Sequence, residues 1–565
     1  MIPPRLWVTR GPLLGLALAL MAGLYLPRAQ AAKKTGPPPA IAFLMPSGGK
    51  AGSTFPCTVG GTFTKTATEV WTDHPGLVFK ATAKPGIFEV TLAPDTPLGP
   101  HLVRFYTGQG ASPPRTFVVG AMDELNEVEP NDDLHHPQSI TKLPVTINGR
   151  FEKAGDVDTF SVHLEAGHWL AADLQGYALG SQMDPAMKLL DESGVELAMS
   201  HDTFNLDPFL AYEVKKTGAY LIQIMSFVHP PAADVTLKGS DAHVYRLTLS
   251  DQPYARTCTP CAVQRADPTA VRPLGPNYGA EASGMKAAPP EPARSETTHL
   301  LTANGEQVLL AVVNSPVITA KAPEDSVLRA QRIPFPCTVS GVLPTPKAEA
   351  RFAFPATRNT RYELRVHAFS LHSPLDSYLQ IEDKAGKVLL QADDNGEGVF
   401  DPSVGWNAPA DGDYIAVVRD LFGRGGWDFT YALEVDSPQP LLSAALDANA
   451  YKIEPGKTTE LKLTAKVTGS FKGKLMAHAE GLPSGIKMED AEIPLKGGEM
   501  KLTLTAQPDA APANQPFEIT LSTSAPDPPM QWKAMFDLRG VEPRGDRLIN
   551  EDSHVWLTVA SAAKP

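Results

Sequence analysis

An acidic segment near residue 130 carries the residue types that could hold a metal ion. The sequence EVEPNDD, residues 127–133, places four carboxylates and one amide around a single proline. So many like charges in one loop repel one another unless water or a cation neutralises them. Calcium takes six to eight oxygen ligands at about 2.3–2.6 Å, and carboxylates that alternate along an extended segment converge on one side of it. Two interpretations are open at this point, a calcium site or a solvated acidic linker.

Motifs for other chemistries are missing from the sequence. It has no H-E-x-x-H pair for zinc, no G-x-S-x-G nucleophile turn and no G-x-x-x-x-G-K-[ST] phosphate loop. The glycine-rich SGGKAGS at 47–53 lacks the upstream glycine and the Lys-Ser/Thr order, so we interpret it as a turn. We expect a non-catalytic protein. A hidden hydrolase stays open, because a scattered catalytic triad leaves no motif.

The elements that must position the acidic segment are expected to be strands. The chain has 54 prolines and 45 glycines, which lie as punctuation between short apolar runs. Within the runs apolar and polar residues alternate, as in YELRV at 362–366, and turn signals recur every 8 to 12 residues. This pattern predicts an all-β fold of tandem β-sandwich domains. With 565 residues and 42% hydrophobic content, the chain is long enough for three or four cores.

The N-terminus predicts export. Arg5 and Arg10 give a positive start, an apolar run follows at 11–26, and Ala29-Gln30-Ala31 is a small-residue cleavage site, so residues 1–31 resemble a signal peptide. No later segment reaches the roughly 18 uninterrupted apolar residues of a spanning helix. We therefore expect a secreted or periplasmic chain without a transmembrane segment after cleavage. The net charge of -13 argues against a nucleic-acid partner, which would need clustered Lys and Arg.

Four cysteines are too few for a disulfide framework in an exported chain of this size. Cys258 and Cys261, in CTPC, could form a local disulfide, remain two free thiols, or belong to a redox or metal motif. Cys57 and Cys337 each lie in a strand-like FPCTV, where a thiol usually acts as a small hydrophobic side chain. The sequence leaves the state of the CTPC pair open.

An internal repeat organises the middle of the chain. LPVTINGRF at 143–151 reappears as FPCTVSGVL at 335–343, an offset of 192 residues. The offset holds through later positions until two residues are inserted in one loop. Matched pairs are Phe160 with Phe352, Ser181 with Ser373, Asp184 with Asp376, Asp202 with Asp394 and, after the insertion, Asp207 with Asp401. We call residues 124–250 copy one and residues 318–436 copy two, and expect each to be one domain.

The flanks of the repeat also predict sandwiches. Residues 40–120 and 440–560 contain alternating runs such as IFEVTLAP and TTELKLTAKV, which resemble immunoglobulin-like β-sandwich modules. Between the copies, residues 252–298 are rich in Pro, Ala and Gly. That composition favours an extended linker or a degraded domain.

The motifs of copy one resemble the bacterial pre-peptidase C-terminal domain. They are E-x-E-P-N-D, G-R-F, G-D-V-D-T-F, a Gly-Ser-x-x-Asp-Pro turn and a final TGAYLIQI strand, and copy two matches them less well. The resemblance implies jelly-roll-like appendages of secreted proteins, often cut from exported peptidases and sometimes binding collagen or other polymers. In calcium-binding relatives the ion sits between the acidic linker and the D-x-D-x-F strand. The resemblance therefore implies six ligands: Glu127, Glu129, Asn131, Asp132, Asp156 and Asp158.

Copy two lacks most of these oxygens. Asp156 and Asp158 align with Ala348 and Ala350, and the loop reads APEDS, with Ala322 opposite Glu129 and Glu324 opposite Asn131. If the scaffold needed the carboxylates, copy two could not fold without them, so they more plausibly serve a separable task. We expect calcium in copy one and not at the matching site of copy two. The second acidic turn of copy two, Asp393-Asp394-Asn395 with Asp401, is interpreted as turn chemistry.

The sequence thus supports two functions. The first is an exported, non-catalytic array of β-sandwiches, calcium-stabilised in copy one, that binds an extracellular polymer or an envelope protein. The second is an accessory or targeting part of a separately encoded secreted hydrolase or peptidase. The first should bind an insoluble polymer or cell surface alone, whereas the second should co-purify with a hydrolase.

Overall fold

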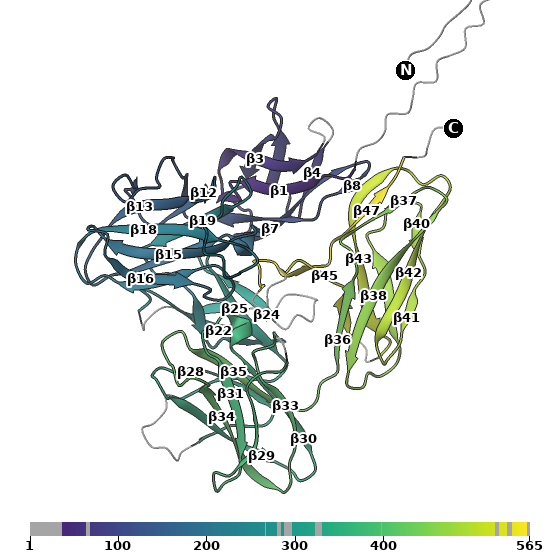
Figure 1. Cartoon of the computed structure of the whole chain (residues 1–565). Coiled ribbons are helices and arrows are strands. Elements are labelled where there is room, and N and C mark those ends of the chain that lie inside the picture. Colours follow the sequence, from purple (N-terminus) through teal and green to yellow (C-terminus); the bar gives the residue numbers. More distant parts are fainter. Residues whose placement is uncertain are drawn as a thin grey trace, which may run out of the picture. The chain divides into compact units, whose positions relative to one another are not determined.

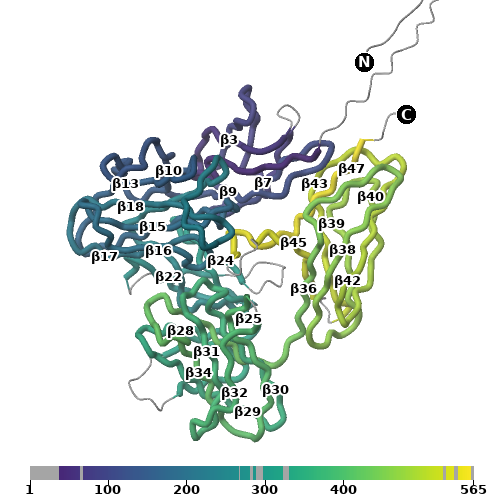
Figure 2. The backbone as a smooth tube through the Cα atoms, viewed as in Figure 1, coloured from purple at the N-terminus to yellow at the C-terminus, as the bar shows by residue number. Residues whose placement is uncertain are grey.

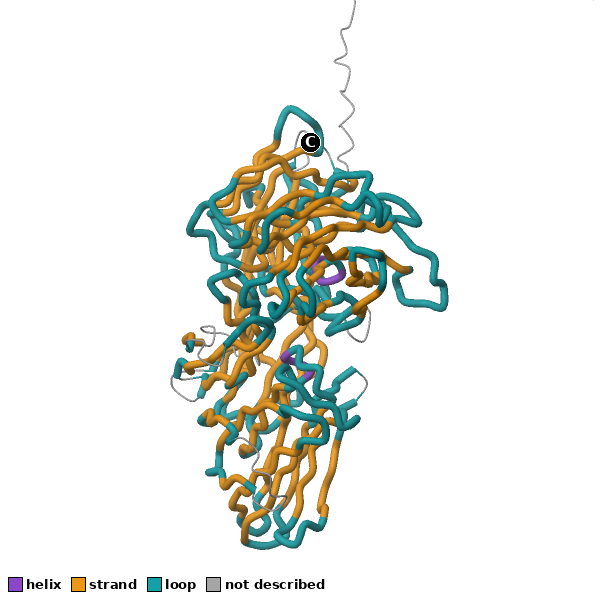
Figure 3. Tube along the Cα trace, turned by 90° about the vertical axis from the view of Figure 1, so that its left-hand side faces the viewer, coloured by secondary structure: helices purple, strands orange, loops and turns teal. Residues whose placement is uncertain are grey.

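The computed structural model describes residues 37–63, 68–265, 267–279, 284–287, 297–321, 330–396, 398–525, 530–539 and 545–561. In these ranges the chain consists of strands, turns and two short 3-10 helices (Figures 1 and 3), which confirms the all-β prediction. No helix in the described part is long and apolar enough to cross a membrane. The expected signal peptide, 1–31, and the APEDS loop of copy two lie outside the described residues.

Residues 40–120 form a four-stranded sheet, ordered β1-β3-β6-β5, and a five-stranded sheet, ordered β2-β9-β7-β4 with β8 pairing β7. Val59, Val90, Phe105 and Phe117 fill the space between them. The strands are β1 (Ala40–Met45), β2 (Gly48–Lys50), β3 (Thr54–Thr62), β4 (Glu69–Thr72), β5 (Leu77–Ala81), β6 (Ile87–Leu92), β7 (Gly99–Thr107), β8 (Gly110–Ala111) and β9 (Arg115–Gly120).

Copy one is a sandwich of two five-stranded sheets, ordered β10-β12-β19-β14-β17 and β11-β13-β18-β15-β16. Its core includes Ile147, Phe160, Leu174, Ile224 and Leu247. The elements are β10 (Asp123–Asn126), β11 (Gln138–Ile140), β12 (Val145–Arg150), β13 (Val157–Leu164), β14 (Trp169–Gln175), η1 (Tyr177–Leu179), β15 (Asp184–Asp191), β16 (Glu196–His201), β17 (Phe209–Glu213), β18 (Gly218–Phe227) and β19 (Val244–Ser250).

Copy two repeats this architecture strand for strand. Its sheets are ordered β26-β28-β35-β30-β33 and β27-β29-β34-β31-β32, and its 3-10 helix falls at the same place. The register agrees, because Asp158 pairs with Ile224 in copy one and Ala350 with Val418 in copy two. The elements are β26 (Val317–Thr319), β27 (Gln331–Arg332), β28 (Cys337–Val342), β29 (Glu349–Ala356), β30 (Arg361–His367), η2 (Phe369–Leu371), β31 (Ser377–Glu382), β32 (Val388–Ala392), β33 (Ser403–Asn407), β34 (Gly412–Asp420) and β35 (Thr430–Asp436).

Of the two alternatives for residues 252–298, the strands exclude an extended linker. Two three-stranded sheets, β20-β22-β23 and β21-β25-β24, enclose a core that includes Cys258, Val263, Val308 and Leu310. The composition of residues 252–298 suggested a linker because β25, the strand that completes the core, lies after the proline-rich stretch. The strands are β20 (Thr257–Thr259), β21 (Ala262–Gln264), β22 (Thr269–Leu274), β23 (Met285–Ala287), β24 (Thr297–Leu301) and β25 (Gln307–Val313).

Residues 440–560 form another sandwich, shown in yellow-green in Figure 2, with sheets β36-β38-β42-β40 and β37-β47-β43-β39-β41. β44 pairs β43, and β45 pairs β46. Leu461, Leu463, Ile519 and Leu557 are central to its core. The strands are β36 (Leu441–Leu446), β37 (Ala450–Ile453), β38 (Thr458–Thr468), β39 (Leu475–Glu480), β40 (Ile486–Met488), β41 (Ala491–Ile493), β42 (Gly498–Ala506), β43 (Ala513–Thr523), β44 (Gln531–Lys533), β45 (Phe536–Asp537), β46 (Glu551–Asp552) and β47 (Val555–Val559).

All four cysteines are buried free thiols. Cys57 lies in the core of the first sandwich and Cys337 in the core of copy two, so each acts as a small hydrophobic side chain. Burial raises the pKa of Cys57 to about 12 and that of Cys261 to about 12, which keeps these thiols protonated.

Candidate metal centre in copy one

Strand β13 carries the two aspartates of the D-x-D-x-F motif on its inward face. Side chains alternate along a strand, so Asp158 shares a face with Phe160 and Val162, which are core residues. Asp156 precedes the strand on the same side, and both aspartates are 0% exposed. The motif therefore places two carboxylates at the end of the sandwich core, where an unpaired charge is costly.

The acidic segment crosses from one sheet to the other at this end. It leaves β10, which runs parallel to β12, and enters β11, which runs parallel to β13. Two backbone hydrogen bonds fix the crossing: the Glu127 amide donates to the Asn148 carbonyl at 2.9 Å, and the Thr159 amide donates to the Asn131 carbonyl at 3.0 Å. The crossing segment is thereby held over the start of β13.

Four of the six expected ligands converge. One carboxylate oxygen each from Glu129, Asp132, Asp156 and Asp158 lies within 4.8 Å of all the others. Asp156 and Asp158 are buried, Glu129 is half-buried and Asp132 is exposed, so the cluster opens to solvent on the Asp132 side. The Lys153 ammonium lies 3.3 Å from Asp132 Oδ2 and 3.5 Å from Asp156 Oδ1, where it offsets part of the negative charge.

Several buried polar atoms of the cluster have no hydrogen-bond partner. They are Glu129 Oε1, both side-chain polar atoms of Asn131, Asp156 Oδ1 and Asp158 Oδ1. Buried polar groups in folded proteins are normally hydrogen-bonded, so several unpartnered oxygens at one site require an explanation. A cation among these oxygens would satisfy them, and the acidic cluster can therefore hold a metal ion.

Three carboxylates of the cluster, those of Glu129, Asp156 and Asp158, have raised pKa values. Burial, followed by the nearby charge of Glu127, raises the pKa of Asp158 well above its ordinary value. Burial also raises the pKa of Asp156 and Glu129, with further increases from neighbouring carboxylates. Such shifts are expected where buried carboxylates lie close together, and the Lys153 ammonium offsets only part of the effect at Asp156.

Glu127 lies outside the cluster and is connected to it through the Tyr245 hydroxyl. Its Oε1 accepts the Arg150 amide at 2.9 Å, and its Oε2 lies 2.5 Å from the Tyr245 hydroxyl, which also lies 2.5 Å from Asp158 Oδ2. Burial raises the pKa of Glu127 to about 7, against opposing hydrogen bonds from Tyr245, the Arg150 amide and Asp158. With both oxygens engaged, Glu127 orients Asp158 through Tyr245 in this structure.

Tyr245 is the functional residue that motif reasoning missed. It lies on β19, far from the acidic segment in sequence. The strand pairings Gly149 with Tyr245 and Gly341 with Tyr431 match it to Tyr431 of copy two, whereas the offset of the repeat after its insertion does not. Gly149 of the G-R-F motif makes room for it, because a Cβ there would collide with the Tyr245 ring and with Glu127 Oε2. The glycine is thus required by close approach rather than by backbone angle.

In copy two, small apolar side chains occupy the same place. The Ala320 amide donates to the Ser340 carbonyl at 2.7 Å, the counterpart of the Glu127 bond to Asn148. Ala320, Ala348 and Ala350 pack against the copy-two core, and a Cβ at Gly341 would meet both Ala320 and Tyr431. The scaffold, its glycine and its tyrosine are present, while the described counterparts of Glu127, Asp156 and Asp158 are alanines.

A second pair of aspartates has a structural role in both copies. Asp207 accepts three backbone N–H groups at the start of η1, from Gly176, Tyr177 and Ala178, at 3.1, 2.7 and 2.8 Å. Asp401 does the same for η2 at 2.8–3.1 Å. Burial raises the pKa of Asp207 to about 7, although the three N–H groups oppose that shift. The interpretation of Asp401 as turn chemistry agrees with these contacts.

Comparison with known proteins gives partial likenesses. No family model matches the chain. A protein of Deinococcus radiodurans, described as a probable subtilase-type serine protease, is 31% identical over 120 residues, which are 20% of this chain and 16% of that protein. The chain therefore spans only a small part of the length of this relative.

Solved structures give weaker likenesses. The pre-peptidase C-terminal domain of a Bacillus anthracis collagenase matches over its whole length and 20% of this chain, at 17% identity and a TM-score of 0.17. An alpha-2-macroglobulin from Escherichia coli matches over 88% of this chain and 49% of its own, at 9% identity and a TM-score of 0.14. At such scores these likenesses carry no argument about function.

Proposed function

We propose that this chain is an exported, non-catalytic array of β-sandwiches that binds calcium in copy one and attaches to an extracellular polymer or an envelope protein. Two observations carry the calcium assignment: Glu129, Asp156 and Asp158 each have a buried oxygen without a hydrogen-bond partner, and carboxylate oxygens of these residues and Asp132 lie within 4.8 Å of one another. Copy two folds into the same sandwich with alanines at two of these positions. The carboxylates therefore serve binding rather than the fold.

Calcium fits the donor set better than other common ions. Every side chain in the cluster offers oxygen, and the described cluster contains no thiol or imidazole of the kind that zinc prefers. Magnesium demands near-ideal octahedral geometry at about 2.0–2.1 Å and keeps several waters, whereas calcium accepts irregular shells of six to eight oxygens. Carboxylates at mixed depths, with an open side at Asp132, suit the more permissive ion.

Hydrogen exchange of the full chain, read peptide by peptide, tests the calcium assignment. Extracellular modules bind calcium with Kd of roughly 10⁻⁴–10⁻³ M. About 1 mM calcium should therefore stabilise copy one by roughly 0.4–1.4 kcal/mol. We expect slower exchange in residues 127–134 and 156–160 and no change in 348–354, the matching strand of copy two.

The controls for this experiment are built into the chain. Asp156→Ala and Asp158→Ala should abolish the calcium effect and leave a folded domain, because alanine occupies both positions in copy two. Magnesium at the same concentration should protect less. Identical exchange of residues 127–134 in chelator and in millimolar calcium would show that EVEPNDD is a solvated crossing segment and would refute the assignment.

Export and attachment are tested separately. We expect the mature chain to begin after Ala31 or Ala32, which mass analysis of the native protein reads directly. For attachment, the purified chain should be retained by insoluble envelope or matrix material without another protein. A chain that stays in the cytoplasm with Met1 intact, or that no such material retains, would contradict this part of the proposal.

A second candidate function is supported by the partial likeness to a probable subtilase-type serine protease. In this alternative the chain is an accessory or targeting part of a separately encoded hydrolase. The two functions differ in one observable, since the accessory part should co-purify with a hydrolase from secreted fractions. Recovery of such a hydrolase in fixed stoichiometry would favour the accessory role over an independent binding array.

A further inference from the structure

Lys153 places a positive charge at the open side of the acidic cluster in copy one. Its ammonium donates a hydrogen bond to Asp132 Oδ2 at 3.3 Å and lies 3.5 Å from Asp156 Oδ1. The side chain is 63% exposed, so it covers the cluster from the solvent side. The neighbouring Arg150 guanidinium pairs instead with carboxylates outside the cluster. Lys153 therefore bridges the crossing segment, which carries Asp132, to the turn that carries Asp156.

The backbone around Lys153 is fixed, so its side chain can move while the turn stays in place. The Asp156 amide donates to the Lys153 carbonyl at 3.2 Å, and the Gly155 amide donates to the Leu237 carbonyl at 3.2 Å. A Cβ at Gly239 would lie 2.2 Å from the Lys153 carbonyl oxygen, so the two segments approach closely there. The ammonium, by contrast, lies at the end of a flexible and exposed stem.

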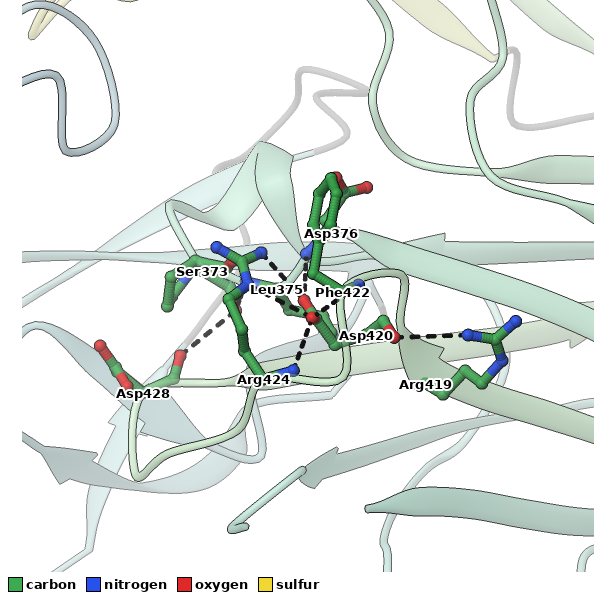
Figure 4. A network of polar contacts seen from close by, with 9 residues as sticks. Ser373, Leu375, Asp376, Arg419, Asp420, Phe422, Arg424 and Asp428 are labelled. Atoms are coloured by element: carbon green, nitrogen blue, oxygen red, sulfur yellow. Dashed lines mark hydrogen bonds and ion pairs between the residues drawn. The ribbon is translucent and has the colours of Figure 1, made fainter. Parts of the chain in front are cut away.

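Copy two shows how this protein holds a permanent internal counter-ion. Asp420 is 2% exposed, and the Arg424 guanidinium bonds both of its oxygens, at 2.9 and 3.2 Å (Figure 4). Three backbone amides, those of Asp376, Phe422 and Arg424, donate to the same carboxylate at 2.8–3.1 Å. Burial raises the pKa of Asp420, but these hydrogen bonds outweigh burial and the pKa is lowered. Both oxygens of Asp420 thus have partners within copy two.

The contacts of Lys153 are looser than those of Arg424. One ammonium faces a cluster of four carboxylates, and Asp156 Oδ1 still has no hydrogen-bond partner. Burial raises the pKa of Asp156, and the charge of Lys153 opposes that shift only in part. Exposed lysine–carboxylate pairs are weak, because water and salt screen them. Lys153 is therefore a counter-ion that a divalent cation can replace.

We propose that Lys153 competes with calcium for the acidic cluster: its ammonium bridges Asp132 and Asp156 in the metal-free domain and is displaced into solvent when the ion binds. Calcium lies about 2.3–2.6 Å from its oxygen ligands. An ion held by Asp132 and Asp156 would therefore come close to the ammonium, and the two positive charges repel each other. The bridge stabilises the metal-free domain and raises the Kd for calcium. This inference rests on the proposed function, because it adds a regulating residue to the same metal centre.

The internal repeat supports this role. The offset of 192 residues places Thr345 opposite Lys153, just as it places Ala348 opposite Asp156. Copy two folds into the same sandwich, so the scaffold does not require the charge of Lys153. The lysine is absent from the copy that lacks the aspartates. This is expected of a residue that serves the acidic cluster rather than the fold.

Zero-length cross-linking of the full chain tests the bridge. A water-soluble carbodiimide activates a carboxylate, and an amine in contact with that carboxylate forms an amide with it while the urea leaves. In chelator we expect a Lys153–Asp132 cross-link, identified by peptide mass analysis, and in millimolar calcium we expect much less of it. The matched control is the Lys142–Asp123 pair, whose charged atoms lie 2.6 Å apart outside the cluster. Its cross-link should not respond to calcium.

Calorimetric titration of the full chain with calcium measures the competition. Lys153→Met keeps an unbranched stem and removes the charge, so it should lower the Kd about twofold to tenfold. It should also speed hydrogen exchange of residues 127–134 in chelator. Lys153→Arg keeps the charge and should have a Kd at or above the wild-type value. Lys142→Met removes a similarly exposed ion pair outside the cluster and should leave the Kd unchanged.

The proposed function and this inference fail in different ways. If the wild-type chain binds calcium and Lys153→Met binds it no more tightly, the calcium assignment stands and the inference falls. A Lys153–Asp132 cross-link that persists in saturating calcium, or that is missing in chelator while the Lys142–Asp123 cross-link forms, would also overturn the inference. If neither the wild type nor Lys153→Met binds calcium, the calcium assignment itself falls and the inference falls with it.

Discussion

Copy one and copy two have the same sheet order, the same register and the same capped 3-10 turn, yet they differ where the crossing segment meets the start of the inner strand. In copy one this end holds buried carboxylates with unpartnered oxygens, and in copy two it holds Ala320, Ala348 and Ala350 packed on the core. The difference teaches that the sandwich does not depend on the carboxylates. A site can thus be gained or lost at the end of this scaffold while the strands are kept.

The loop after β18 in copy one and β34 in copy two also differs, and here copy two has the additional polar contacts. Copy two carries the Asp420–Arg424 ion pair, and copy one has Ser226 at the position of Asp420. Each copy therefore has one feature that the other lacks: the acidic cluster in copy one and the Asp420–Arg424 ion pair in copy two. Variants that move a feature between the copies, or remove a feature that both share, test this division.

The largest expected effect comes from restoring the carboxylates in copy two. Ala348→Asp with Ala350→Asp should destabilise that domain by about 3–5 kcal/mol, because two charges enter a packed apolar site that lacks the other ligands. Chemical denaturation followed by exchange of residues 348–354 measures it. A fully stable double variant that acquires calcium protection would show that the two alanines alone account for the missing site and that the other ligands are not needed.

Removing the shared cap should damage both copies. Asp207→Ala and Asp401→Ala each leave three backbone N–H groups without their acceptor, at a cost of roughly 2–4 kcal/mol. The loss should be larger in copy one, because Asp207 is buried and Asp401 is half-buried. Faster exchange confined to residues 176–180 or 368–372 identifies the affected turn, and an unchanged rate in either would contradict a capping role.

Substitutions of Tyr245 and Tyr431 distinguish a role in the metal centre from a role in the scaffold. Tyr245→Phe removes the hydroxyl that lies between Glu127 and Asp158 and should cost copy one about 1–3 kcal/mol without calcium. Tyr431→Phe, which faces Ala320 instead, should cost less. Equal losses from the two substitutions, measured by denaturation in chelator, would mean that Tyr245 serves packing alone.

The pH dependence of copy one should reverse when calcium is added. The pKa of Glu127 is raised to about 7 and that of Asp158 is raised as well, so without calcium the folded domain binds more protons than the unfolded chain. Its stability is therefore full below about pH 4.5, the ordinary glutamate value, and is lost as the pH rises through about 7. We expect a decrease on the order of 1–2 kcal/mol between pH 5 and 8 in chelator.

With calcium the trend should be opposite, since the ion binds the deprotonated carboxylates and its stabilisation grows as protons leave. Asp158→Ala should remove most of both trends. Exchange of residues 127–134 at several pH values, corrected for the intrinsic rate, measures them. A stability that is flat with pH in both media would argue against a coupled carboxylate cluster.

Much of the scaffold could be predicted from the sequence. Alternating runs such as YELRV became strands with one buried face, because period two places one side of a strand in the core. The constant offset between Phe160 and Phe352 foretold two domains with matching register. The same alternation put Asp156 and Asp158 on the inward face with Phe160. Local residue type and spacing determine these features, so they can be predicted from the sequence alone.

Contacts between distant segments were decided by the tertiary structure alone. Glu127 belongs to the acidic motif, yet the Arg150 amide on β12 and the Tyr245 hydroxyl on β19 each engage one of its oxygens, so it is not one of the four residues that converge. Residues 252–298 form sheets because β25 arrives from beyond the proline-rich stretch to complete a core. The backbone at Phe422 is likewise fixed by a side chain, because the Asp420 carboxylate accepts the Phe422 amide. The spacing of residues in the sequence does not predict these contacts. Each of them depends on which distant segment of the chain packs against the residue.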